Sequence, residues 1–170
     1  MPDLRDDLRR SLTGRVCLMG IGNPDRGDDG LGVQLAEAVR AAGYPGVIVA
    51  ERTPEQWIAE TVRGGWQTVV LLDAVEMGSP AGTVVLLDAR EIAARFPQVS
   101  THKLSLGTIA RLIEAEGAMR VCLLGVQPAC VGHAAGLSDP VCTTLEILRA
   151  LLIEILPVGN ELLAICGERP

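Results

Sequence analysis

The segment Arg15–Val39, RVCLMGIGNPDRGDDGLGVQLAEAV, decides the fold of this chain. Its first part, Arg15–Met19, is apolar enough for a short buried strand. Its last part, from Gly30, repeats apolar residues at the spacing of one helical face. A Gly-rich loop, Gly20–Asp29, joins the two. A strand that leads through a tight loop into a helix is a unit of an α/β fold.

Apolar strand-like segments and helix-like segments alternate along the rest of the chain. The expected strands are residues 15–19, 47–50, 68–72, 83–87 and 120–126. The expected helices are residues 30–42, 54–62, 89–95, 104–116 and 140–156. Strands that are apolar throughout and alternate with helices indicate a parallel sheet that is covered on both faces.

One strand departs from the parallel pattern. The strand expected at 83–87 begins only about ten residues after the strand at 68–72 ends, and a parallel crossover needs about a dozen or more. We therefore expect this strand to be antiparallel. The predicted fold is a three-layer α/β domain, with a twisted, mostly parallel five-stranded sheet and helices on both faces. The 170 residues fit one domain at 15–157, with flexible extensions at 1–14 and 158–170.

Composition excludes several classes of function. Apolar residues make up 48% of the chain and charged residues 21%, an ordinary globular balance. A net charge of −6 disfavours nucleic acid as a partner, and the apolar runs are too short to span a membrane. The five cysteines include no C-x-x-C pair, and residues 1–10 lack the apolar core of a signal peptide. These features predict a cytoplasmic protein.

The loop Gly20–Asp29 stands where a dinucleotide-binding fold would hold a pyrophosphate. The fingerprint fails, because Asp25 occupies the position of its third glycine. Asp28 and Asp29 also place negative charge at the helix start, where a phosphate would bind. A nucleotide-binding enzyme is therefore a weak alternative. Capping of the helix explains one of the two acids, and we assign Asp28 to that role.

Two acids and one histidine form a candidate metal site. Asp29 follows the first expected strand and Asp73 ends the third, and ligands of open α/β sheets bind where strands end. His102 precedes a helix. Each residue alone also fits an ordinary cap, turn or surface role. Together, two carboxylates and an imidazole suit nickel, zinc or iron(II).

Four motifs, in order, resemble those of hydrogenase maturation endopeptidases. They are GIGNPDRGDDGLG (20–32), LLDAVEMG (71–78), THKLSL (101–106) and LLGVQP (123–128). The last is typical of the subgroup that acts on hydrogenases of the hydrogenase 3 type. The similarity extends from about Val16 to Leu148. One segment departs from the pattern, because Glu51 and Arg52 replace the small residues of a Gly-rich turn that many members have.

The resemblance implies a hydrolase, an aspartic-type endopeptidase. It would remove the C-terminal extension of a [NiFe]-hydrogenase large-subunit precursor after nickel insertion. It implies that Asp29, Asp73 and His102 are the catalytic and metal-contacting residues, with nickel supplied by the substrate and no organic cofactor. The residues leave open whether the metal assists catalysis or only recognition. A non-catalytic chaperone of the nickel site is a second alternative.

Overall fold

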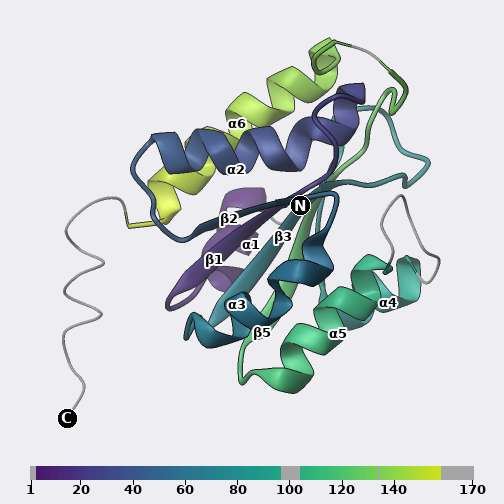
Figure 1. The fold of residues 1–170 in the computed structure, drawn as a ribbon. Coiled ribbons are helices and arrows are strands. Elements are labelled where there is room, and N and C mark those ends of the chain that lie inside the picture. Colours follow the sequence, from purple (N-terminus) through teal and green to yellow (C-terminus); the bar gives the residue numbers. More distant parts are fainter. Residues whose placement is uncertain (1–2, 97–103, 134, 158–170) are drawn as a thin grey trace.

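The structure, a computed structural model, describes residues 3–96, 104–133 and 135–157. It contains a five-stranded sheet in the order β2-β1-β3-β5-β4 (Figure 1). The strands are β1 Val16–Ile21, β2 Val47–Glu51, β3 Thr68–Ala74, β4 Val84–Asp88 and β5 Arg120–Val126. β1 pairs in parallel with β2 and β3, and β3 with β5, whereas β4 is antiparallel to β5. The predicted mostly parallel sheet with one antiparallel strand is confirmed.

Helices cover both faces of this sheet. The helical elements are α1 Leu4–Ser11, η1 Gly27–Gly30, α2 Leu31–Ala41, η2 Pro54–Trp57, α3 Ile58–Arg63, α4 Ala89–Arg95, α5 Leu106–Glu116 and α6 Asp139–Ile155. Residues of α1, α2 and α6 form one buried cluster, and residues of α3, α4 and α5 form the other. The three-layer prediction is therefore confirmed. None of the helices that the structure describes is long and apolar enough to cross a membrane.

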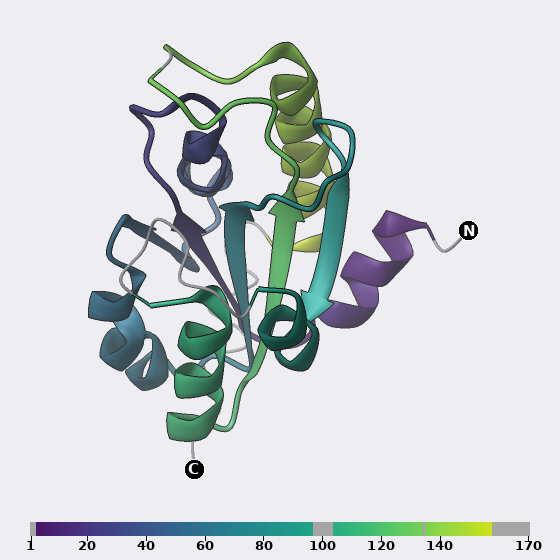
Figure 2. The ribbon, with the colours of Figure 1, turned by 90° about the vertical axis from the view of Figure 1, so that its right-hand side faces the viewer.

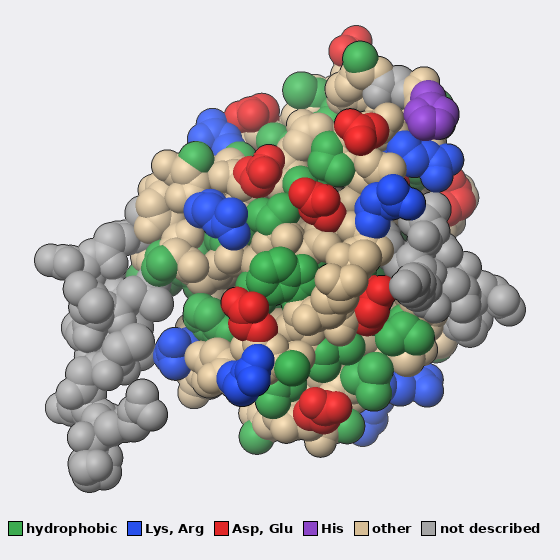
Figure 3. Space-filling model, viewed as in Figure 1, with side chains coloured by type: hydrophobic (Ala, Val, Ile, Leu, Met, Phe, Trp, Pro, Cys, Tyr) green, Lys and Arg blue, Asp and Glu red, His purple; other side chains and the backbone are tan. Residues whose placement is uncertain are grey.

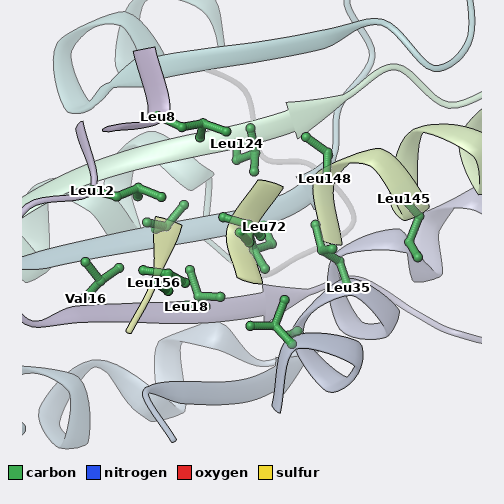
Figure 4. Packing of buried hydrophobic residues seen from close by; sticks show 14 of the residues in the cluster. Leu8, Leu12, Val16, Leu18, Leu35, Leu72, Leu124, Leu145, Leu148 and Leu156 are labelled. Carbon is green, nitrogen blue, oxygen red and sulfur yellow. The ribbon is translucent and has the colours of Figure 1, made fainter. Parts of the chain in front are cut away.

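The alternation of side chains along each strand explains why two clusters form. Leu18, Leu72 and Leu124 belong to the cluster under α2 and α6 (Figure 4). Their neighbours Met19 and Leu71 belong to the opposite cluster. Both sets are buried, because successive side chains of a strand point to opposite faces and helices cover each face. This is why the central strands are apolar at every position.

Helix α2 is held close to the ends of β1 and β3. A Cβ atom added to Gly32 would lie 2.0 Å from the Leu72 carbonyl oxygen and 2.4 Å from that of Ile21. Only a glycine therefore permits this approach. It places the first turn of α2, and η1 before it, at the edge of the sheet where β1 and β3 end, which we call the carboxyl rim.

The N-terminal segment differs from the expectation of a flexible extension. Residues 4–11 form α1, which lies beside β4 at the edge of the sheet (Figure 2). Leu8 is fully buried and Leu12 is nearly so, both in the cluster with α2 and α6. The two leucines are four residues apart and therefore lie on one face of the helix, but the many charged residues around them make this apolar face hard to recognise in the sequence. The domain therefore includes α1. Residues 158–170 lie outside the described residues.

Leu8→Ala is expected to lower the free energy of unfolding by about 2–5 kcal/mol, the usual range for a buried leucine that leaves a cavity. The matched control is Asp6→Ala on the exposed side of the same helix, which should change it by less than about 0.5 kcal/mol. Urea denaturation followed by circular dichroism measures both. Equal stability of the two variants would show that α1 is not part of the cooperative unit.

Candidate active site

Asp29 lies at the end of a loop that closes on itself. The Asn23 N–H donates to the Asp29 carbonyl oxygen at 3.1 Å and to its carboxylate Oδ2 at 3.0 Å. Gly22 adopts φ 124°, and a Cβ atom there would lie 1.8 Å from the Asp29 carbonyl oxygen. Glycine is therefore required where the loop folds back. The result is a fixed and nearly buried carboxylate, 6% exposed.

Asp73 approaches the same loop from the neighbouring strand. It lies within β3, which continues two residues beyond the predicted end, and it is 3% exposed. Its Oδ1 lies 3.7 Å from the position that a Cβ atom on Gly22 would occupy. The same position touches the Asp29 carbonyl oxygen. Asp29, through its backbone, and Asp73, through its carboxylate, thus both lie beside Gly22 at the carboxyl rim.

His102, the third predicted member of the site, lies outside the described residues. Within residues 3–96, 104–133 and 135–157, no group of three His, Cys, Asp or Glu side chains is arranged to hold a metal ion. The three-residue metal site therefore stays a prediction. The other histidine, His133, is exposed on the loop after β5, in agreement with the histidine side chain that is visible on the surface in Figure 3.

The role assigned to Asp28 is wrong. Helix α2 begins after Gly30 and has no side-chain cap. The Asp28 carboxylate instead accepts hydrogen bonds from four donors on the loop after β5. The donors are the N–H of Ala129 at 2.8 Å, of Cys130 at 3.1 Å and of Ser138 at 2.7 Å, and the Ser138 hydroxyl at 2.8 Å. Burial raises the pKa of Asp28, but these hydrogen bonds outweigh it and hold the pKa below its usual value.

Gln127 is a second buried polar residue whose hydrogen bonds hold the carboxyl rim together. This role is not apparent from the sequence. Its side-chain oxygen accepts from the N–H of Met77 at 2.7 Å and of Ser79 at 3.2 Å. Its amide nitrogen donates to the Glu76 carboxylate at 2.9 Å. Gln127 is buried at the end of β5, so it fastens the segment that follows Asp73 to the next strand. The only signal in the sequence was its place in the LLGVQP motif.

The turn after β2 also reaches the site. The Gly22 N–H donates to the Glu51 carbonyl oxygen at 3.0 Å. Glu51 has φ 51°, the only positive φ among the non-glycine residues that the structure describes. This left-handed conformation favours glycine, which explains why a Gly-rich turn would suit this position. Glu51 and Arg52 are both exposed, so the departure changes the surface beside the site and not the buried acids.

The geometry favours contact with a cation over phosphate binding. Two buried carboxyl groups, one from η1 and one from β3, suit a divalent metal ion or a general acid–base role. A phosphate would need free N–H groups in the loop. The N–H groups of Asn23 and Asp28 donate instead to Asp29 and to the Cys130 carbonyl oxygen. The nucleotide-binding alternative therefore gains no support.

Comparisons with known proteins show the family to which the chain belongs. Residues 33–155 match the family model described as hydrogenase maturation protease. The chain is 31% identical over 131 residues to the hydrogenase 3 maturation protease of Escherichia coli K12, covering 76% of this chain and 83% of that protein. It is similar to the crystal structure of the [NiFe] hydrogenase maturation protease HycI from Thermococcus kodakarensis KOD1. That match has a TM-score of 0.78 and 29% identity, and covers 88% of this chain and 98% of the other. The hydrogenase maturating endopeptidase HybD from E. coli, at 22% identity and a TM-score of 0.66, supports the fold alone.

Proposed function

The chain belongs to the hydrogenase maturation protease family, and on this premise we propose that it removes the C-terminal extension of a [NiFe]-hydrogenase large-subunit precursor. Its relatives are named as proteases, so the reaction is hydrolysis of a peptide bond. The similarity to a hydrogenase 3 maturation protease supports a large subunit of that type as the substrate.

The observation that carries the proposal is that two buried acids, Asp29 and Asp73, both lie beside Gly22 at the carboxyl rim. We assign both to contact with nickel that the substrate brings, and His102 to the third contact. A nickel ion held by the precursor carries positive charge to the rim, where the two acids attract it. The contact aligns the precursor, so that its C-terminal segment lies beside the acids.

The acids also have a chemical role available to them. Hydrolysis of a peptide bond requires a water molecule to attack the carbonyl carbon and a proton to reach the leaving nitrogen. A carboxylate within hydrogen-bond distance of that water acts as the general base. We assign this role to the rim acids, which gives the aspartic-type mechanism.

Free thiols at four described cysteines support a reducing compartment, and we place the reaction in the cytoplasm.

The test is the intact mass of a matched, nickel-loaded large-subunit precursor before and after incubation with the protein. The expected result is one new mass, smaller by a single C-terminal peptide, together with the free peptide. A precursor incubated alone is the control. If a stable complex forms but the mass stays unchanged, the chain is a chaperone of the nickel site and not its protease.

A further inference from the structure

The loop that follows β5 lies against the loop that carries the candidate acids. We call it the rim loop, residues 127–133 and 135–138. It starts at the carboxyl rim, because β5 pairs with β3 and the register sets Gly125 beside Asp73. Ala129, Cys130, Val131 and His133 are exposed, with Val131 at 41%. The rim loop therefore offers a surface beside Asp73 and Asp29.

One buried side chain fixes both ends of the exposed part of this loop. Asp28 accepts from the N–H groups of Ala129 and Cys130 at the start and from the N–H and hydroxyl of Ser138 at the end. The Asp28 N–H donates back to the Cys130 carbonyl oxygen at 3.0 Å. Asp28 is 1% exposed. Hydrogen bonds to a buried charge are strong, and a loop with two glycines, Gly132 and Gly136, would otherwise be free to move.

A hollow of about 190 Å³ lies between the anchored loop and η1. Its walls include Gly27 and Asp28 on one side and Cys130, Ala135 and Leu137 on the other. At about 30 Å³ per water molecule, it has room for one small or medium-sized side chain. Its lining is mostly apolar, and both carboxylate oxygens of Asp28 already accept hydrogen bonds from the loop. It therefore suits an apolar side chain.

We infer that Asp28 is a positioning residue for the substrate. It holds the rim loop in place against the segment that carries Asp29, and the hollow between them accepts one apolar side chain of the precursor near the scissile bond. The inference rests on the proposed function. Asp28 is adjacent to Asp29 in the chain, so the anchored loop lies close to the candidate acid. The Asp29 carboxylate is held separately, by the Asn23 N–H, so a change at Asp28 is expected to act on the seat of the peptide and not on the acid.

The first test compares Asp28→Asn with Ser138→Ala. In Asp28→Asn an acceptor oxygen is replaced by an NH2 donor, which cannot accept hydrogen bonds from the N–H groups of the loop. Ser138→Ala removes only one of the four hydrogen bonds, that of the hydroxyl. Amide hydrogen exchange at Ala129, Cys130 and Ser138 should accelerate strongly in Asp28→Asn and weakly in Ser138→Ala. With nickel-loaded precursor, KM should rise by about tenfold or more in Asp28→Asn, the loss expected for one strong contact. kcat should change by less than about threefold, well within one decade of rate.

The second test fills the hollow without touching Asp28. Ala135→Phe should raise the KM for the same precursor, whereas Ile147→Phe, at an exposed position of α6 outside the rim loop, should leave KM near the wild-type value. If amide hydrogen exchange is faster in Asp28→Asn but KM is unchanged, Asp28 stabilises the loop without positioning the substrate, and the inference is wrong. A fall in kcat at constant KM, or equal effects of the two phenylalanines, would overturn it as well.

Binding separates this inference from the proposed function. The affinity of each variant for the nickel-loaded precursor is measured by titration, without any need for cleavage. If the wild-type protein binds the precursor but does not cleave it, the proposed function fails. The comparison of Ala135→Phe with Ile147→Phe then still decides the inference. Weaker binding of Ala135→Phe alone supports the hollow as a peptide subsite, and equal binding refutes it.

Discussion

Replacing Asp29 or Asp73 by alanine is expected to lower the rate of precursor processing by at least about 100-fold, the order of loss that follows removal of one contact made in the transition state. Each carboxyl group lies at the carboxyl rim and neither belongs to the apolar clusters. The fold should therefore survive. His102→Ala is expected to have an effect of the same size. The measurement is the initial rate of peptide release from nickel-loaded precursor, with thermal unfolding recorded for every variant.

Two controls make this result specific. Asp25→Ala removes an exposed acid from the same Gly-rich loop and should leave the rate within about threefold of wild type, since exposed substitutions usually perturb little. Cys130→Ala should also be tolerated, because no base that would activate a cysteine nucleophile contacts this thiol among the described residues. Normal processing by Asp73→Ala, or none by a stably folded Cys130→Ala, would move the catalytic role elsewhere.

Cleavage is expected to require nickel in the precursor. Each contact between a carboxylate and a bound cation resembles a charged hydrogen bond, which contributes about 1.5–3 kcal/mol to the free energy of the interaction. Two such contacts amount to about 3–6 kcal/mol, and about 1.4 kcal/mol corresponds to a tenfold change. Nickel-free precursor should therefore be processed at least about 100-fold more slowly. Metal insertion would then be checked before the tail is removed.

The nickel requirement is measured with one precursor preparation divided into nickel-free and nickel-loaded halves. A zinc-loaded sample serves as a control for charge alone. The protein itself supplies only carboxylates and an imidazole, so free nickel added without insertion into the precursor should not restore the rate. Equal rates for both halves would show that the rim acids act without the metal, even if both acids proved essential.

Most of the fold could be predicted from the sequence because its physical signals are local. The five strands are apolar runs, and a connection too short for a parallel crossover identified β4 as antiparallel. The packing of α1 against the domain was missed because Leu8 and Leu12 stand among charged residues. This packing depends on a surface made by α2 and α6, which is distant in the sequence.

The site shows the same limit. Asp29 and Asp73 could be expected near one another because each follows a strand of the sheet, and their role in the site stays a prediction. Asp28 was assigned to a local cap, yet its partners lie 101 to 110 residues further along the chain. Nothing in a carboxylate beside a helix shows that it binds a distant loop. The role of Gln127 likewise depends on Met77 and Ser79, which only the folded sheet brings near it.

The most direct test of the central claim is the intact mass of the large subunit in four mixtures. Wild-type protein and its isosteric variant Asp73→Asn are each incubated with nickel-loaded and with nickel-free precursor. The predicted result is loss of the C-terminal peptide in one mixture only, that of wild-type protein with nickel-loaded precursor. Loss of the peptide in both mixtures that contain Asp73→Asn, at the wild-type rate, would contradict the claim that the carboxyl rim processes a nickel-bearing substrate.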